Sequence, residues 1–176
     1  MFTVVHLHLL LNHLPIIVTA LALALLAIAI WRQDDTIART GLAFLVGAAV
    51  SALPTYLTGE GSEDLVEKLP DVTEALVESH SDIALVAALV VGALGIAALW
   101  AIWRYRKPAR IPRRFVLALL AGSLVGAGLM GYTGLLGGQI RHTEVRPGYV
   151  EPTAGEKAIT DGENRRRETA SPGDHD

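Results

Sequence analysis

The sequence predicts an all-α membrane protein, a four-helix up-and-down transmembrane bundle. Hydrophobic residues make up 51% of the 176 residues, charged residues only 19%, and the mean hydropathy is +0.40. Four runs are almost free of charge, at about 9–31, 41–58, 81–103 and 115–140. Each approaches or exceeds the roughly 18 apolar residues that suffice to cross a bilayer. A soluble domain with four such helices would have no amphipathic shell to cover them.

The first run is expected to stay in the mature protein as a membrane helix. No Lys or Arg precedes it, whereas the start of a secretory signal peptide carries positive charge, and its apolar part is long. We therefore assign residues 1–146 to one transmembrane domain. Residues 147–176 form a polar tail rich in Pro and Gly, expected to be disordered or ordered only against a partner.

The connection at 59–79 is acidic and periodic, which predicts one or two short amphipathic helices lying over the outer ends of the bundle as a lid. Ser62 and Asp71 are the expected N-caps, and Pro70 separates the two pieces. The apolar positions at helical spacing are Leu65, Leu69, Val72 and Leu76.

Basic residues orient the bundle, because Lys and Arg in short loops favour the cytoplasmic side. The first connection carries Arg32 and Arg39, and the third reads RYRKPARIPRR. The opposite ends of the helices carry few basic residues. We expect a bacterial inner-membrane protein with both termini on the periplasmic side. Membrane orientation therefore explains the positive charge of the third connection, and we do not expect nucleic acid as a partner.

Five of the six histidines fall on this outer side: His6, His8, His13, His80 and His142. Because a helix rises by about 1.5 Å per residue, His13 and His80 lie at similar depth near the outer hydrocarbon boundary. Imidazoles gathered at one depth on different helices favour a shared ligand over separate hydrogen bonds. His175, near the end of the tail, is expected to be solvated.

The first hypothesis for the ligand is a b-type haem held by two axial histidines, with His13 and His80 as the pair and His8 and His142 as further candidates. Cysteine is absent, which excludes covalent c-type attachment, and Met130 lies too deep to be the second ligand. Gly131, Gly134 and Gly138 are expected to make room for the porphyrin. The competing interpretation of this glycine-rich run is close helix packing, through Ala118, Gly122 and Gly126. Haem here suits electron transfer between a membrane quinol and an external redox protein.

Two alternatives stay open. One is a bare Zn or Cu ion, again centred on His13 and His80, with carboxylates such as Glu60, Glu78 or Asp82. The other is an accessory subunit of a larger membrane complex, or a homodimer formed through the glycine-rich face. The haem hypothesis and these two alternatives describe an electron carrier, a metal-binding protein and an accessory subunit. None of the three is a stand-alone catalyst.

Three segments resemble a known family: HLLLNHLPI, the acidic connection TGEGSEDLVEKLPDVTEALVESH, and GYTGLLGGQIRHTEVR. They are similar to landmarks of the bacterial membrane proteins called domain of unknown function 2231, over about 8–146. In this chain Leu9 stands where the family has Pro, and Leu14 where it has Phe. The family's occasional fusion to Rieske-type iron-sulfur domains implies a redox setting. The positions that the resemblance transfers are His8, His13, Pro15, His80, Gly137 and Gly138.

Overall fold

The computed structural model describes residues 3–106, 108–151, 153 and 166. The chain divides into two compact units, Met1–Arg141 and His142–Asp176. Within the second unit, the described part contains one short 3₁₀ helix, Thr143–Val145.

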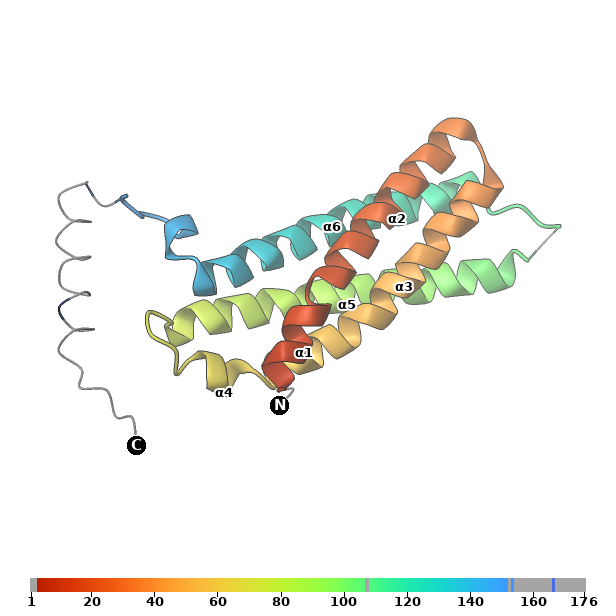
Figure 1. Cartoon of the computed structure of the whole chain (residues 1–176). Helices are drawn as coiled ribbons and strands as arrows, with labels where there is room; N and C mark the ends of the chain where they lie inside the picture. The colour runs from red at the N-terminus through yellow and green to blue at the C-terminus, as the bar shows by residue number, and fades with distance from the viewer. Residues whose placement is uncertain (1–2, 107, 152, 154–165, 167–176) are drawn as a thin grey trace. The chain divides into compact units, whose positions relative to one another are not determined.

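The first unit is an up-and-down helical bundle, which confirms the predicted fold class (Figure 1). α1 (Val4–Leu11) and α2 (His13–Arg32) together make the first span, and α3 (Asp35–Glu60), α5 (Glu74–Arg104) and α6 (Arg113–Arg141) make the others. All four spans are long and apolar enough to cross a membrane. α2 packs on α3 and α6, and α5 packs on the same two helices. α2 and α5 are therefore diagonal in the bundle.

The first span begins earlier than the sequence predicts and is divided at Asn12. α1 starts at Val4 because Thr3 caps it: the Thr3 hydroxyl accepts from the His6 backbone N–H. α1 packs mainly on α3 and less on α2. The part of α1 before Leu9 therefore extends the span beyond the expected start, and it carries His8 to the end of α3.

The connection between α3 and α5 contains one of the one or two short helices that the sequence predicts. One four-residue helix, α4 (Glu63–Val66), follows Ser62, and turns occupy the rest of the connection up to Thr73. Asp71 does not cap a helix, because its backbone is left-handed with φ of 62°; Thr73 precedes α5 instead. Pro70 explains the interruption, since it has no N–H for a helix and restricts the residue before it.

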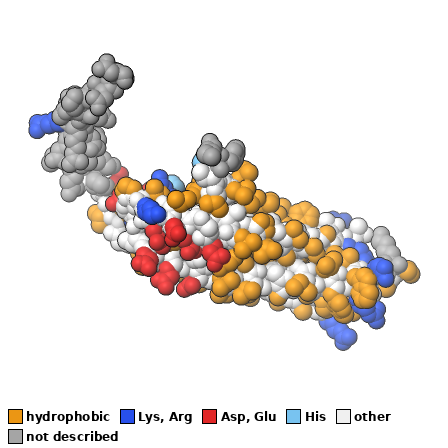
Figure 2. All heavy atoms as spheres, turned by 90° about the horizontal axis from the view of Figure 1, so that it is seen from below, with side chains coloured by type: hydrophobic (Ala, Val, Ile, Leu, Met, Phe, Trp, Pro, Cys, Tyr) orange, Lys and Arg blue, Asp and Glu red, His pale blue; other side chains and the backbone are white. Residues whose placement is uncertain are grey.

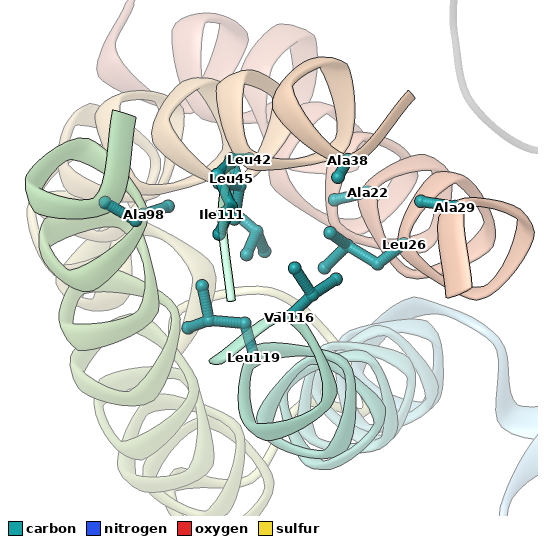
Figure 3. Packing of buried hydrophobic residues seen from close by; sticks show 11 residues of the cluster. Ala22, Leu26, Ala29, Ala38, Leu42, Leu45, Ala98, Ile111, Val116 and Leu119 are labelled. Carbon is teal, nitrogen blue, oxygen red and sulfur yellow. The ribbon is translucent and has the colours of Figure 1, made fainter. Parts of the chain in front are cut away.

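Small residues let the helices approach closely in the core. A Cβ added at Gly95 would collide with the Ala49 side chain, and one added at Gly122 would lie 2.6 Å from Leu94 Cδ2. Close packing is thus the role of Gly122, as the glycine-rich pattern indicated. The buried side chains at the Arg-rich end of the bundle are small or aliphatic (Figure 3). They include Ala22, Leu26, Leu42, Leu45, Ala98, Ile111 and Leu119.

The surface of the bundle carries a hydrophobic belt with acidic side chains gathered at one end and basic ones at the other (Figure 2). Exposed Trp31 and Trp103 stand near the basic end of their helices. Tryptophan favours the level of lipid headgroups, so these two residues mark the membrane boundary on that side.

The bundle consists of two helical hairpins, α2 with α3 and α5 with α6. The two hairpins bury residues at equivalent positions. A constant shift in residue number relates four of the five buried residues of α2 to buried residues of α5. A second constant shift relates five of the seven buried residues of α3 to buried residues of α6. The pairs are Pro15 and Ala87, Thr19 and Val91, Leu26 and Ala98, Ala29 and Ala101, Ala38 and Val116, Gly41 and Leu119, Leu45 and Ser123, Ala48 and Gly126, and Ala52 and Met130. Parallel repeats of this kind place equivalent residues at the same height on opposite sides of an axis along the membrane normal.

Candidate histidine site

His8 is a half-buried residue of α1 whose ring lies against the end of α3. Its Nδ1 is 3.1 Å from the backbone carbonyl oxygen of Thr55 and 3.4 Å from the hydroxyl of Thr58. Gly59 leaves space for the ring, because a Cβ there would lie 2.9 Å from His8 Cε1. The imidazole thus occupies a position beside α3 that any larger residue at 59 would obstruct.

His80 has the same arrangement in the second hairpin. It lies on α5, is half-buried, and its Nδ1 is 3.0 Å from the carbonyl oxygen of Thr133 on α6. A Cβ at Gly137 would lie 3.0 Å from His80 Cε1. The two imidazoles therefore have the same surroundings: each contacts a threonine carbonyl and a glycine on the neighbouring helix.

These two sets of residues are equivalent in the internal repeat. His80 is related to His8 by the shift that relates Ala87 in α5 to Pro15 in α2. Thr133 and Gly137 are related to Thr55 and Gly59 by the shift that relates α6 to α3. The shared segment reads Thr-x-Leu-x-Gly, as TYLTG in α3 and TGLLG in α6. This short repeat was the available sequence signal for Thr55, Gly59 and Thr133, which sequence reasoning missed.

The carbonyl contacts determine which ring nitrogen carries the proton in the neutral imidazoles. A backbone carbonyl only accepts hydrogen bonds, so Nδ1 of each ring must be the donor. Each Nε2 then keeps a lone pair, and neither makes a hydrogen bond to a described residue. The His8 ring and the Glu63 carboxylate both lie within electrostatic range of the His80 ring. Two ligand-type nitrogens thus lie at one end of the bundle.

His13 does not share this interior position. It is the first residue of α2 and is exposed on the helix surface. The physical reason is helical periodicity: a separation of five positions from His8 turns the two side chains about 140° apart around the axis. The structure therefore places His8, and not His13, against the neighbouring helix, while the pairing of His13 with His80 stays a prediction.

His6 and His142 contact residues close to them in the chain. The His6 Nδ1 lies 2.7 Å from the Thr3 hydroxyl at the start of α1. In the second unit, His142 is exposed and its Nδ1 is 2.9 Å from Glu144 Oε1. Hydrogen bonds from its own backbone N–H and from His142 hold the pKa of Glu144 below its usual range. His175 lies outside the described residues.

The three glycines expected to make room for a cofactor do not face the histidines. Gly131 and Gly134 are exposed, and Gly134 lies beside Ile16. Gly138 has open space where a Cβ would point. The glycine in contact with an imidazole is Gly137, because α6 turns that position toward α5.

An inward stripe of polar residues continues from His8 toward the bilayer centre. Asn12 and Thr19 follow His8 at helical spacing, about one and three turns on, which places all three on one face. Asn12 Oδ1 and Thr19 Oγ1 are buried and have no hydrogen-bond partner among the residues that the structure describes. The position equivalent to Thr19 in α5 is Val91, so this hydroxyl is peculiar to the first hairpin.

A bare metal ion finds few ligands in this arrangement. The described part of the chain contains no group of three or more His, Cys, Asp or Glu side chains able to hold a metal ion. Zinc sites use three or four protein ligands.

Comparison with known proteins gives one match. The family described as "Predicted membrane protein (DUF2231)" matches residues 5–144, which include both hairpins and both imidazoles. No curated protein and no solved structure matches the chain. The chain is a membrane protein that belongs to the DUF2231 family.

Proposed function

We propose that the protein binds a b-type haem through His8 and His80 and carries electrons at the outer face of the bacterial inner membrane. The single observation that carries this proposal is the matched pair of Nδ1–H to carbonyl contacts, at 3.1 Å from Thr55 and 3.0 Å from Thr133. Metal-ligating histidines commonly donate their second ring N–H to a backbone carbonyl, which orients the free nitrogen toward the metal.

Haem fits this site better than a bare ion because of the number of ligands. A porphyrin supplies four nitrogens to the iron and leaves two axial positions for protein side chains. The site offers two imidazoles with free Nε2, one from each hairpin. His8 and His80 would hold the iron, and Gly59 and Gly137 would keep their rings seated. When bound, the haem would supply one-electron chemistry, and this chain's residues would set its position and exclude water.

The surroundings support an electron carrier at the outer side. The acidic connection lies at the end of the bundle that holds the two imidazoles, and Glu63 acts electrostatically on His80. Exposed Asp64 and Glu67 extend this acidic surface. Charge complementarity would favour docking of a basic external redox protein there. A quinol in the surrounding bilayer would be the electron donor.

The test is an optical spectrum of the detergent-purified protein, oxidised and reduced, after expression with ample haem supply. We expect the Soret and α bands of a bis-imidazole b-type haem. His8→Ala and His80→Ala should each abolish that spectrum, whereas His13→Ala, on the exposed face of α2, is the matched control and should keep it.

Absence of any Soret band would overturn the proposal. Loss of haem from His13→Ala with retention in His8→Ala would also overturn the ligand assignment. If the haem-free chain instead co-purified with a larger membrane assembly, the accessory-subunit alternative would replace it.

A further inference from the structure

A cavity of about 250 Å³ lies at the end of the bundle opposite the histidines. It forms where the α2–α3 turn meets the α5–α6 connection and the start of α6. Ala29, Ile30 and Val116 supply apolar wall, and Gln33, Arg110 and Arg113 supply polar groups. It shares no residue with the histidine site, so it is a separate feature of the fold.

Two acidic residues, Asp34 and Asp35, also line this cavity, and both already accept hydrogen bonds. The Asp34 carboxylate accepts from the Thr36 and Ile37 backbone N–H groups at 2.7 and 3.1 Å, as the cap of α3. Asp35 accepts from the Ile111 backbone N–H at 3.0 Å and from Arg39 Nε at 2.7 Å. These bonds tie the two connections together, and the Arg39 guanidinium balances the charge of the Asp35 carboxylate.

The two arginines at the cavity are not engaged in the same way. Arg110 and Arg113 are exposed, and neither has an ion pair or a hydrogen-bonded partner for its guanidinium within the described part of the chain. Arg110 acts on Asp35 only at a distance. Two forked cationic groups without a partner in the described part of the chain therefore line a cavity that also has apolar side chains in its wall.

The level of the cavity in the membrane indicates the chemistry of its occupant. Trp31 and Trp103, exposed at the same end, mark the headgroup region. Planar guanidinium groups match the oxygens of a phosphate in a bidentate manner. Basic pockets between membrane helices on the cytoplasmic side are known to bind lipid headgroups. An arginine pair in a cavity that also has apolar lining, at the level of the headgroups, suits a phosphodiester with an acyl chain attached.

We infer that this cavity is a binding site for the phosphodiester of a membrane phospholipid, held by Arg110 and Arg113. Ile30 and Val116 contact the apolar part of the lipid. The Ile111 side chain, buried between the helices (Figure 3), limits how far the lipid enters. Inorganic phosphate shares the anionic group of the lipid but lacks the acyl chain. Comparing the binding of phosphate with that of lipid therefore distinguishes a lipid site from a site for free phosphate.

The experiment is native mass spectrometry of the detergent-purified chain titrated with dioleoyl phosphatidylglycerol, dioleoyl phosphatidylethanolamine or inorganic phosphate. The cavity variant is Arg110→Gln/Arg113→Gln. The matched control, Arg104→Gln/Arg114→Gln, removes the same charge from the helix ends that flank the same connection but lie outside the cavity. Melting curves without added lipid verify that both variants fold.

We expect the cavity variant to bind at least one of the two lipids about tenfold more weakly, as loss of charge-assisted hydrogen bonds implies, while the control changes by less than about twofold. Equal weakening in both variants would show diffuse surface attraction and overturn the inference. So would unchanged binding in the cavity variant. Binding of inorganic phosphate as tight as that of lipid, lost in the cavity variant, would replace the lipid site by a soluble-phosphate site. Haem content plays no part in any of these outcomes.

Discussion

His8 and His80 each direct Nδ1 at a threonine carbonyl on the second helix of their own hairpin, at 3.1 Å and 3.0 Å. The two contacts are related by the same shifts in residue number that relate the buried faces of the hairpins. A repeat of this kind places both rings at one height in the bundle. The proposed haem site thus depends on the duplication of a single structural unit.

The glycines behind the imidazoles give the first prediction. In Gly137→Ala the new Cβ would lie 3.0 Å from His80 Cε1, which displaces the ring from Thr133. We expect weaker haem binding, and the displaced imidazole should cancel or exceed the gain of up to about 1 kcal/mol that alanine brings to a helix. In the control, Gly131→Ala, nothing lies within 4 Å of the new Cβ, and alanine should stabilise the helix by up to about 1 kcal/mol. Thermal unfolding in detergent and haem titration measure both; equal behaviour of the two variants would contradict the proposed packing.

The Arg39 guanidinium joins the start of α3 to the α5–α6 connection at the basic end of the bundle. It donates to Asp35 at 2.7 Å and to the carbonyls of Tyr105 and Ala109 at 2.6 and 2.7 Å. Arg39→Met keeps the apolar stem but removes these bonds, and we expect a loss of about 1–3 kcal/mol because they are partly exposed to solvent. Arg114→Met, at an exposed position, should change stability by less than about 0.5 kcal/mol. Denaturation in mixed micelles would compare them, and the idea fails if Arg39→Met melts with the wild type.

Thr19 carries a fully buried hydroxyl with no hydrogen-bond partner among the described residues. Thr19→Val keeps the shape, reproduces the valine found at the equivalent position in α5, and removes an unpaired polar group. We expect a gain of about 1 kcal/mol or more. The comparison is Thr133→Val, which removes a hydroxyl that bonds the Leu129 carbonyl at 2.9 Å and should not stabilise. A clear loss of stability in Thr19→Val would instead indicate that this hydroxyl binds something within the bundle.

The proposed orientation can be measured because the chain contains no cysteine. Single variants Glu67→Cys and Arg106→Cys place an exposed thiol near the acidic and the basic end of the bundle. In intact cells a membrane-impermeant maleimide should label the first and not the second, whereas both should react after permeabilisation. Labelling of Arg106→Cys alone in intact cells would reverse the topology and place the histidines on the cytoplasmic side.

The membrane spans were predictable from sequence because apolar length and charge segregation are local properties. The runs at 41–58 and 115–140 lie within α3 and α6, and the depth of His80 follows from its place at the start of a span. The N-cap expected at Asp71 was wrong, because the left-handed backbone of Asp71 after Pro70 interrupts a pattern that hydrophobic spacing alone presented as helical.

The choice between His8 and His13 depends on the direction of each side chain around a helix that is apolar on all sides. Hydrophobic periodicity is weak in such a helix, so the sequence determined the depth of the histidines but not which one faces inward. The packing of α1 against α3 decided that, by seating His8 against Gly59 and turning His13 outward. In the same way, the packing of α5 against α6 places Gly137 next to the His80 ring. The sequence could not show which glycine of α6 contacts the imidazole, because this depends on how the two helices pack together.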